Sequence, residues 1–123
     1  MAEAKIYEGG CHCGAVRYRV TLALDPVIAC NCSICSKTGA LLAFAPAERI
    51  ELLRGAELLT DYRWGKKRIH HLFCARCGIR SFSRGPGRTG EPTVAVNDRC
   101  LEGVDLDALA PRKFDGRALP IEA

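Results

Sequence analysis

The stretch Cys30-Asn31-Cys32-Ser33-Ile34-Cys35 places three thiols within six residues. Core packing does not call for this pattern, because a buried apolar run would use valine or leucine and a disulfide would use only one of these cysteines. A tight turn with C-x-C-x-x-C spacing can instead direct all three sulfurs toward one soft cation. The stretch therefore predicts a metal site, and the open question is whether that site is closed or keeps one position free.

Four of the remaining cysteines form two pairs, Cys11/Cys13 and Cys74/Cys77. The segment Cys74-Ala75-Arg76-Cys77-Gly78 is typical of a zinc knuckle, in which two sulfurs cap a turn and the glycine allows positive φ. Together the two pairs would close one four-thiol site. The knuckle could instead complete a site with the triplet, since spacing alone does not fix the partition.

The eighth cysteine, Cys100, decides the chemistry of the second site. If Cys100 binds the same metal as the triplet, that site is closed and its expected role is structural. If it does not, water or an external thiol can enter the fourth position, as catalytic zinc requires. Cysteine is also a common small residue of protein cores, so both alternatives stay open.

Length and composition predict one domain over residues 1–123. The first ten residues contain no apolar leader and no run approaches the ~18–20 apolar residues of a membrane span, so we expect a cytoplasmic protein without membrane association. In a reducing compartment eight cysteines are metal ligands rather than disulfides. The formal charge of +4 counts them as neutral thiols. Thiolates on two zinc ions would remove this excess, which argues against a nucleic-acid partner.

Short apolar segments separated by glycine, proline and charged residues predict an all-β chain. Val16, Tyr18 and Val20 alternate with polar residues, as in a half-buried strand. Residues 33–39 predict a turn or short helix ended by Gly39, residues 104–110 predict one helical turn, and Phe114 is expected to anchor the chain end in the core. The expected strands cover residues 5–8, 15–24, 27–29, 40–45, 48–53, 58–64, 68–73, 79–84 and 92–97.

The three cysteine motifs, C-H-C-G at 11–14, C-x-C-x-x-C at 30–35 and C-x-x-C-G at 74–78, resemble the glutathione-dependent formaldehyde-activating enzyme (GFA) family. Segments 32–35, 53–57, 73–82 and 99–102 look most like its centromere protein V branch. The resemblance covers roughly residues 10–116 and implies antiparallel sheets in a zinc-stabilised, β-tent-like fold with little helix. It also implies a structural zinc on Cys11, Cys13, Cys74 and Cys77, and a second zinc on Cys30, Cys32 and Cys35.

The resemblance further implies a carbon–sulfur lyase that forms or cleaves a glutathione–aldehyde adduct such as S-(hydroxymethyl)glutathione. Ser36 and Lys37 stand where similar proteins often carry two arginines. Lys37 is the candidate for binding a glutathione carboxylate, and the alternative for it is a solvated lysine in a turn. The competing function is a non-catalytic zinc module that binds protein or nucleic acid.

The histidines are weaker candidates for a site. His12 lies between two candidate ligands and is expected to point outward. His70 and His71 are neighbours in one predicted strand, so they lie on opposite faces and at most one of them faces a site. A surface or core role is the expectation for each.

Overall fold

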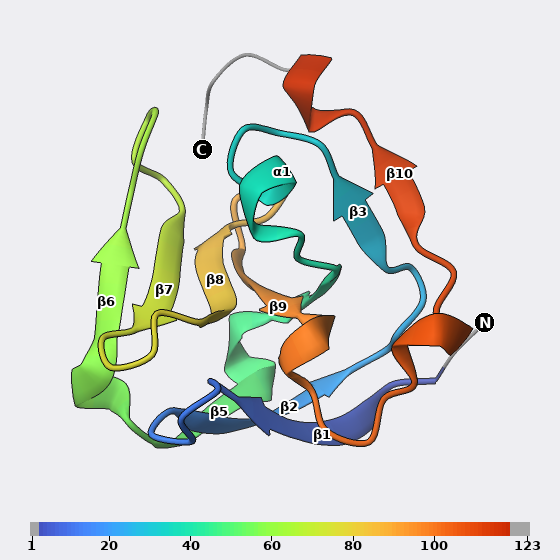
Figure 1. Cartoon of the computed structure of the whole chain (residues 1–123). Helices are drawn as coiled ribbons and strands as arrows, with labels where there is room; N and C mark the ends of the chain where they lie inside the picture. The colour runs from blue at the N-terminus through green and yellow to red at the C-terminus, as the bar shows by residue number, and fades with distance from the viewer. Residues whose placement is uncertain (1–2, 119–123) are drawn as a thin grey trace.

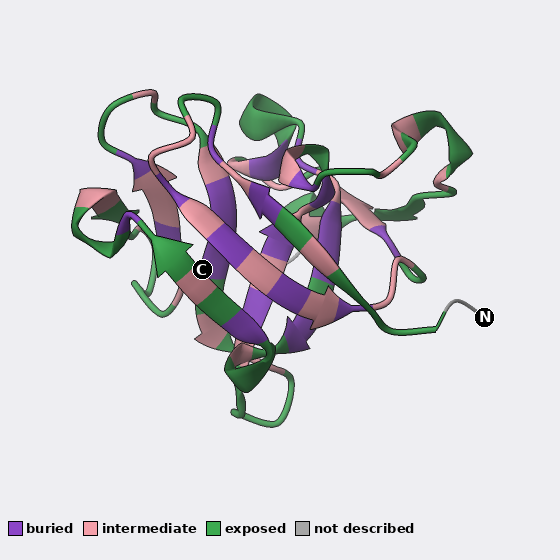
Figure 2. Ribbon diagram, turned by 90° about the horizontal axis from the view of Figure 1, so that it is seen from below, coloured by how far each residue is buried: buried purple, intermediate pink, exposed green. Residues whose placement is uncertain are grey.

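The computed structural model describes residues 3–118, and the alternating segment at 16–21 builds the smaller of its two sheets. Tyr18 and Val20 are fully buried, whereas the arginines beside them are partly exposed. This confirms the predicted alternation, which Figure 2 shows as changing burial along the strands. The sheet has the order β1 (Lys5–Gly10), β2 (Arg17–Leu22) and β5 (Ile50–Arg54), with antiparallel neighbours.

The larger sheet has seven strands, and Figure 1 shows how they are arranged. Its neighbours are antiparallel except for β10 and β3, which form a parallel pair. The predicted all-β, antiparallel fold class is confirmed. In sheet order the strands are β10 (Arg112–Phe114), β3 (Ile28–Cys30), β4 (Leu42–Pro46), β9 (Pro92–Asn97), β8 (Arg80–Pro86), β7 (His70–Cys74) and β6 (Leu59–Tyr62).

Helical structure is limited to short pieces in the described residues. The single α-helical turn, α1 (Cys35–Thr38), ends at Gly39 in the left-handed conformation at φ 68°, which confirms the predicted glycine stop. None of the helices in residues 3–118 is both long and apolar enough to cross a membrane. The 3₁₀ turns are η1 (Ala47–Arg49), η2 (Ala56–Leu58), η3 (Asp98–Cys100), η4 (Leu106–Ala108) and η5 (Gly116–Ala118).

The main core lies between the two sheets. Tyr18 of β2 and Phe82 of β8 meet edge to face with ring centroids 5.5 Å apart, and both are almost completely buried. Valines and alanines of β4 and β9 complete this layer. The same packing holds the β1–β2 turn close to the β7–β8 turn, which is where four of the cysteines lie.

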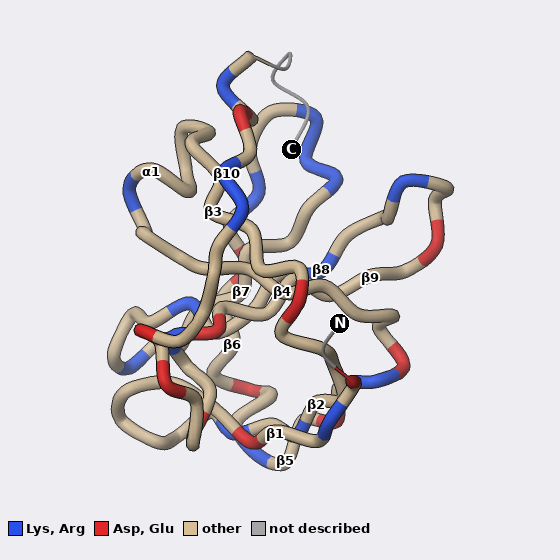
Figure 3. Tube along the Cα trace, turned by 90° about the vertical axis from the view of Figure 1, so that its right-hand side faces the viewer, with Lys and Arg blue, Asp and Glu red and all other residues tan. Residues whose placement is uncertain are grey.

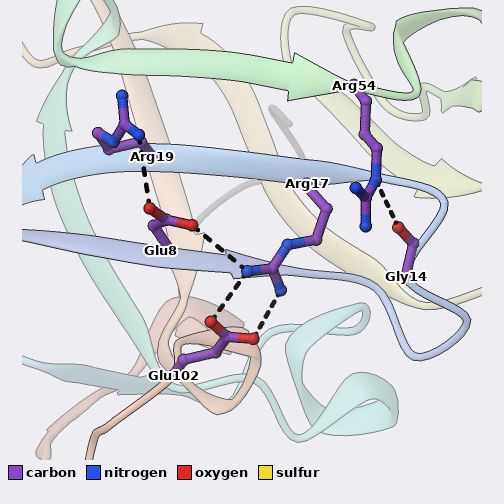
Figure 4. Close-up of polar contacts among 6 residues, drawn as sticks. All are labelled: Glu8, Gly14, Arg17, Arg19, Arg54 and Glu102. Atoms are coloured by element: carbon purple, nitrogen blue, oxygen red, sulfur yellow. Dashed lines mark hydrogen bonds and ion pairs between the residues drawn. The ribbon is translucent and has the colours of Figure 1, made fainter.

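Polar contacts around Arg17 fasten the β1–β2 sheet to the chain after β9 (Figure 4). Arg17 donates two hydrogen bonds to Glu102, at 2.7 and 2.9 Å, and pairs with Glu8 at 3.5 Å. Arg54 of β5 donates to the carbonyl of Gly14 at 3.0 Å, inside the first cysteine turn. Each such surface contact stabilises the fold only slightly, so their main consequence is to fix where this turn lies.

Two sequence-based expectations need correction. Strand β8 continues beyond the predicted end at residue 84, because Gly85 and Pro86 pair with Thr93 and Pro92. Phe114 does not anchor the chain end in the core, since the residue is 45% exposed. The backbone of β10 holds the chain end instead, by pairing with β3.

Candidate metal centres

The first thiol group joins two turns from different sheets. Cys11 and Cys13 follow β1, whereas Cys74 ends β7 and Cys77 lies in the next turn. Their four Sγ atoms lie within 4.8 Å of one another, and the Cys11–Cys13 and Cys13–Cys74 pairs are 3.6 and 3.7 Å apart. Tetrahedral zinc with Zn–S bonds of about 2.3 Å sets its sulfurs about 3.8 Å apart. The group therefore fits a four-coordinate metal ion.

Backbone N–H groups surround these sulfurs. Val16 N–H donates to Cys11 Sγ and Arg76 N–H to Cys74 Sγ, each at 3.3 Å. Burial raises the pKa of Cys77, but N–H groups of Ile79 and Cys13 and the thiols of Cys11 and Cys74 outweigh burial and lower it to about 6. The turn thus favours the thiolate form of Cys77, the form that binds a metal ion.

Glycine conformation makes both turns of the first thiol group possible. Gly14 and Gly78 have φ of 80° and 78°, a region that favours glycine. Gly78 N–H also donates to the carbonyl of Cys74 at 2.8 Å, which closes the knuckle. The structure thus has the knuckle geometry predicted for segment 74–78.

The second thiol group gathers Cys30 at the end of β3, Cys32, and Cys35 at the start of α1. Their Sγ atoms also lie within 4.8 Å of one another, and Cys32 N–H donates to Cys30 Sγ at 3.4 Å. Burial raises the pKa of Cys35 to about 12, with the neighbouring thiol of Cys32 adding to the effect. No fourth Cys, His, Asp or Glu in residues 3–118 joins this group.

Cys100 lies in neither thiol group. Its Sγ is 3.9 Å from the carbonyl of Arg80, and burial raises its pKa. The three thiols that lie within 4.8 Å of one another at the second group are those of Cys30, Cys32 and Cys35, and Cys100 is not among them. The structure therefore does not bring Cys100 to the triplet, where it was a candidate fourth ligand.

A cavity of about 820 Å³ opens beside the second thiol group, and all three of its cysteines line the cavity. Phe44, Trp64, Ile69 and Phe114 form much of its apolar wall. No acidic residue among the described part of the chain lines it. Figure 3 shows lysine and arginine positions at this end of the molecule, near α1, β3 and β10. The basic side chains that line the cavity are Lys37, Arg68, Arg80 and Arg117.

Of the other residues that the sequence suggested for a site, some line the cavity and others lie away from it. Lys37, on exposed α1, lines the cavity as a ligand-binding residue would. His12 is exposed, as expected, and His70 bonds Asp61 at 2.6 Å. His71 is buried and lines the cavity, so the predicted opposite faces of His70 and His71 are observed. Sequence reasoning missed Arg80 and the aromatic wall, because no motif marks them.

Comparisons with known proteins found a matching family and a similar solved structure. The sequence model described as "Glutathione-dependent formaldehyde-activating enzyme" matches residues 6–114. A crystal structure of a Rhodobacter sphaeroides protein, solved as a structural genomics target, is similar with a TM-score of 0.77 and 35% sequence identity. The match covers 87% of this chain and 99% of that one. With its two thiol groups and its fold, this chain belongs to the glutathione-dependent formaldehyde-activating enzyme family.

Proposed function

We propose that the protein is a zinc-dependent carbon–sulfur lyase that forms and cleaves the adduct of glutathione with an aldehyde such as formaldehyde. One observation carries this proposal: the three-thiol group lines a large cavity with basic and apolar walls, and no fourth ligand from the described residues joins it. Glutathione is a thiol with two carboxylates, so its chemistry matches such a cavity. The family description supports the same substrate.

The two thiol groups would divide the work. Cys11, Cys13, Cys74 and Cys77 would hold a structural zinc, because four ligands complete the tetrahedron. Cys30, Cys32 and Cys35 would hold a second zinc with one position for an external ligand. Bound there, zinc would supply a Lewis acid that lowers the pKa of a thiol or water.

The reaction needs no redox partner. The sulfur of glutathione forms a bond to the carbonyl carbon, the π electron pair moves to the oxygen, and this oxygen takes up the proton that the thiol released. Cleavage is the reverse. Lys37 would attract a carboxylate of glutathione at the cavity edge, and the apolar wall around Phe44 and Phe114 would exclude water.

Cobalt substitution tests whether a thiol enters the second site. We expect glutathione to change the visible spectrum of the cobalt-loaded protein, because a new sulfur ligand alters the coordination of cobalt. The variant Cys32→Ser should lose this response, whereas Cys100→Ser should keep it, because Cys100 lies outside both groups. If glutathione changes neither the spectrum nor the heat of binding in calorimetry, the site does not bind thiols and a non-catalytic interaction module becomes the better hypothesis.

A further inference from the structure

A β-bulge interrupts the pairing of β7 with β8. Leu72 pairs with Phe82, but the next residue of β7, Phe73, pairs with Arg80. Ser81 is therefore an extra residue on β8, and its carbonyl accepts a hydrogen bond from the Tyr18 hydroxyl at 3.5 Å. Bulges of this kind re-aim side chains and often lie beside functional sites.

The bulge decides which way Arg80 faces. Side chains alternate along a regular strand, so residues two apart share a face. Without a bulge at Ser81, Arg80 would therefore lie on the core face together with Phe82. With the bulge, Arg80 lines the cavity together with Ser83 and His71, which pair with each other across β7 and β8. The bulge therefore places the charged side chain of Arg80 in the cavity, whereas regular alternation would bury it in the core.

Arg80 has no acidic partner among the described residues. It is partly buried, and Nη1 donates to Nδ1 of His71 at 2.8 Å. A guanidinium can only donate, so Nδ1 accepts from Arg80 in the neutral tautomer that carries its proton on Nε2, and in this tautomer Nε2 does not also accept from Trp64 Nε1. Burial and then the charge of Arg80 lower the pKa of His71 to about 4, which is consistent with this assignment. His71 therefore holds Arg80 in place without neutralising its charge.

The remaining N–H groups of Arg80 can bind an anion. A guanidinium carries five N–H donors in a planar fork that matches a carboxylate, and one bond to His71 leaves the others for a ligand. A partly buried charge is costly unless it is paired. Arg80 also lines the same cavity as all three cysteines of the second thiol group. An anion bound to Arg80 would therefore lie near the reacting sulfur.

We propose that Arg80 is the carboxylate-binding residue of the cavity, and that the substrates are thiol–aldehyde adducts that carry a carboxylate. This proposal rests on the proposed function of the same site. The carboxylate can come from the thiol, as in glutathione, or from the aldehyde, as in a 2-oxo acid. Both sources present the same chemistry to Arg80, and the experiment below separates them.

The fluorescence of Trp64 reports ligand binding at this site. Trp64 is the only tryptophan of the chain, and its Nε1 lies 3.2 Å from Nε2 of His71, beside Arg80. The zinc-loaded protein is titrated with 2-mercaptoethanol and with 3-mercaptopropionate, which adds a carboxylate to a small thiol. A third titration uses 2-mercaptoethanol with glyoxylate. Arg80→Gln should weaken binding of the carboxylate ligand by about tenfold or more and leave 2-mercaptoethanol unchanged.

Arg84→Gln is the matched control, because Arg84 lies on the same strand, is exposed and does not line the cavity. Arg80→Lys should retain part of the affinity, since it keeps the charge but loses the fork. Zinc content and circular dichroism establish whether each variant is folded. If Arg80→Gln is not folded, the affinities of the wild type and of Arg80→Lys for the carboxylate ligand are compared instead, and they test the role of Arg80.

Each outcome has a distinct meaning. A loss limited to 3-mercaptopropionate assigns the carboxylate to the thiol, and a loss limited to the glyoxylate mixture assigns it to the aldehyde. If Arg80 substitutions leave the affinity for both carboxylate ligands unchanged, or weaken the binding of 2-mercaptoethanol equally, the proposed role of Arg80 is wrong. Failure of 2-mercaptoethanol to bind the wild type would instead count against the proposed thiol site, while the carboxylate difference still tests Arg80.

Discussion

Asp98 is fully buried, and neither oxygen of its carboxyl group has a hydrogen-bond partner among the described residues. Burial raises its pKa to about 7, well above the value of about 3.9 for an unfolded chain. Between these two values the folded protein holds the proton more tightly than the unfolded protein does. The contribution of Asp98 to stability is therefore most favourable below about pH 4 and is lost as the pH rises through 7.

Asp98→Asn should remove this pH dependence while keeping the shape of the side chain. From about pH 6 to about pH 8, the variant should gain on the order of 1 kcal/mol in unfolding free energy relative to the wild type, because only the wild type must bury a charge at the higher pH. Urea unfolding of both zinc-loaded proteins at both pH values measures the difference. If the unfolding free energies of the variant and the wild type differ by the same amount at both pH values, the pKa of Asp98 is not raised.

At the scale of single residues, the sequence predicts ligands better than their surroundings. The four-thiol and three-thiol groups follow the partition that the resemblance implied, because cysteine spacing reports directly on metal-binding turns. Arg80, His71 and Asp98 carry no such signal. Their positions depend on which face of a strand or turn becomes buried, and one extra residue in β8 reverses that face.

Strands were predictable as elements because their alternation and their glycine and proline boundaries are local. Strand β9 lies within the predicted bounds, 92–97. The parallel pairing of β10 with β3 was not predictable, since it joins segments more than eighty residues apart. Strand β10 then brings the next residues back onto the second thiol group, which neither cysteine spacing nor hydrophobic pattern could indicate.

Gly116 shows how closely this segment approaches the three-thiol group. A Cβ added at Gly116 would lie 2.6 Å from Cys30 Sγ and 3.1 Å from Cys32 Cβ, which is too close for ordinary contact. Gly116→Ala should therefore displace Cys30 or the segment after β10, and weaken metal binding at the second site. The first site lies elsewhere in the fold and should keep its metal.

Metal stoichiometry after dialysis against a weak chelator measures this effect, with an expected fall from two ions toward one. Gly103→Ala is a suitable control, because a Cβ there meets nothing within 4 Å, although Gly103, unlike Gly116, has a positive φ of 73° that itself disfavours alanine. If Gly116→Ala holds both ions as tightly as the wild type, the close approach at Gly116 does not constrain the site.

For the whole molecule, the two thiol groups differ in what they connect. The first joins the turn after β1 in the small sheet to the end of β7 and its turn in the large sheet, whereas the second lies within the short segment from the end of β3 to the start of α1. A chain of 123 residues buries only a modest core, so a metal ion that joins both sheets contributes strongly to folding. A metal ion at the second site closes only a short local loop.

Loss of one thiol should therefore have opposite consequences at the two sites. Cys13→Ser should lower the thermal midpoint by well over ten degrees, because it opens the link between the sheets at an exposed ligand without leaving a cavity. Cys32→Ser should leave a folded protein with one zinc and no response to thiols. Cys100→Ser should retain two zinc ions, because Cys100 belongs to neither group. Thermal unfolding combined with zinc analysis separates these outcomes. Two tightly bound zinc ions in Cys32→Ser, or equal destabilisation by the Cys13 and Cys32 variants, would show that this division between a structural and a reactive site is wrong.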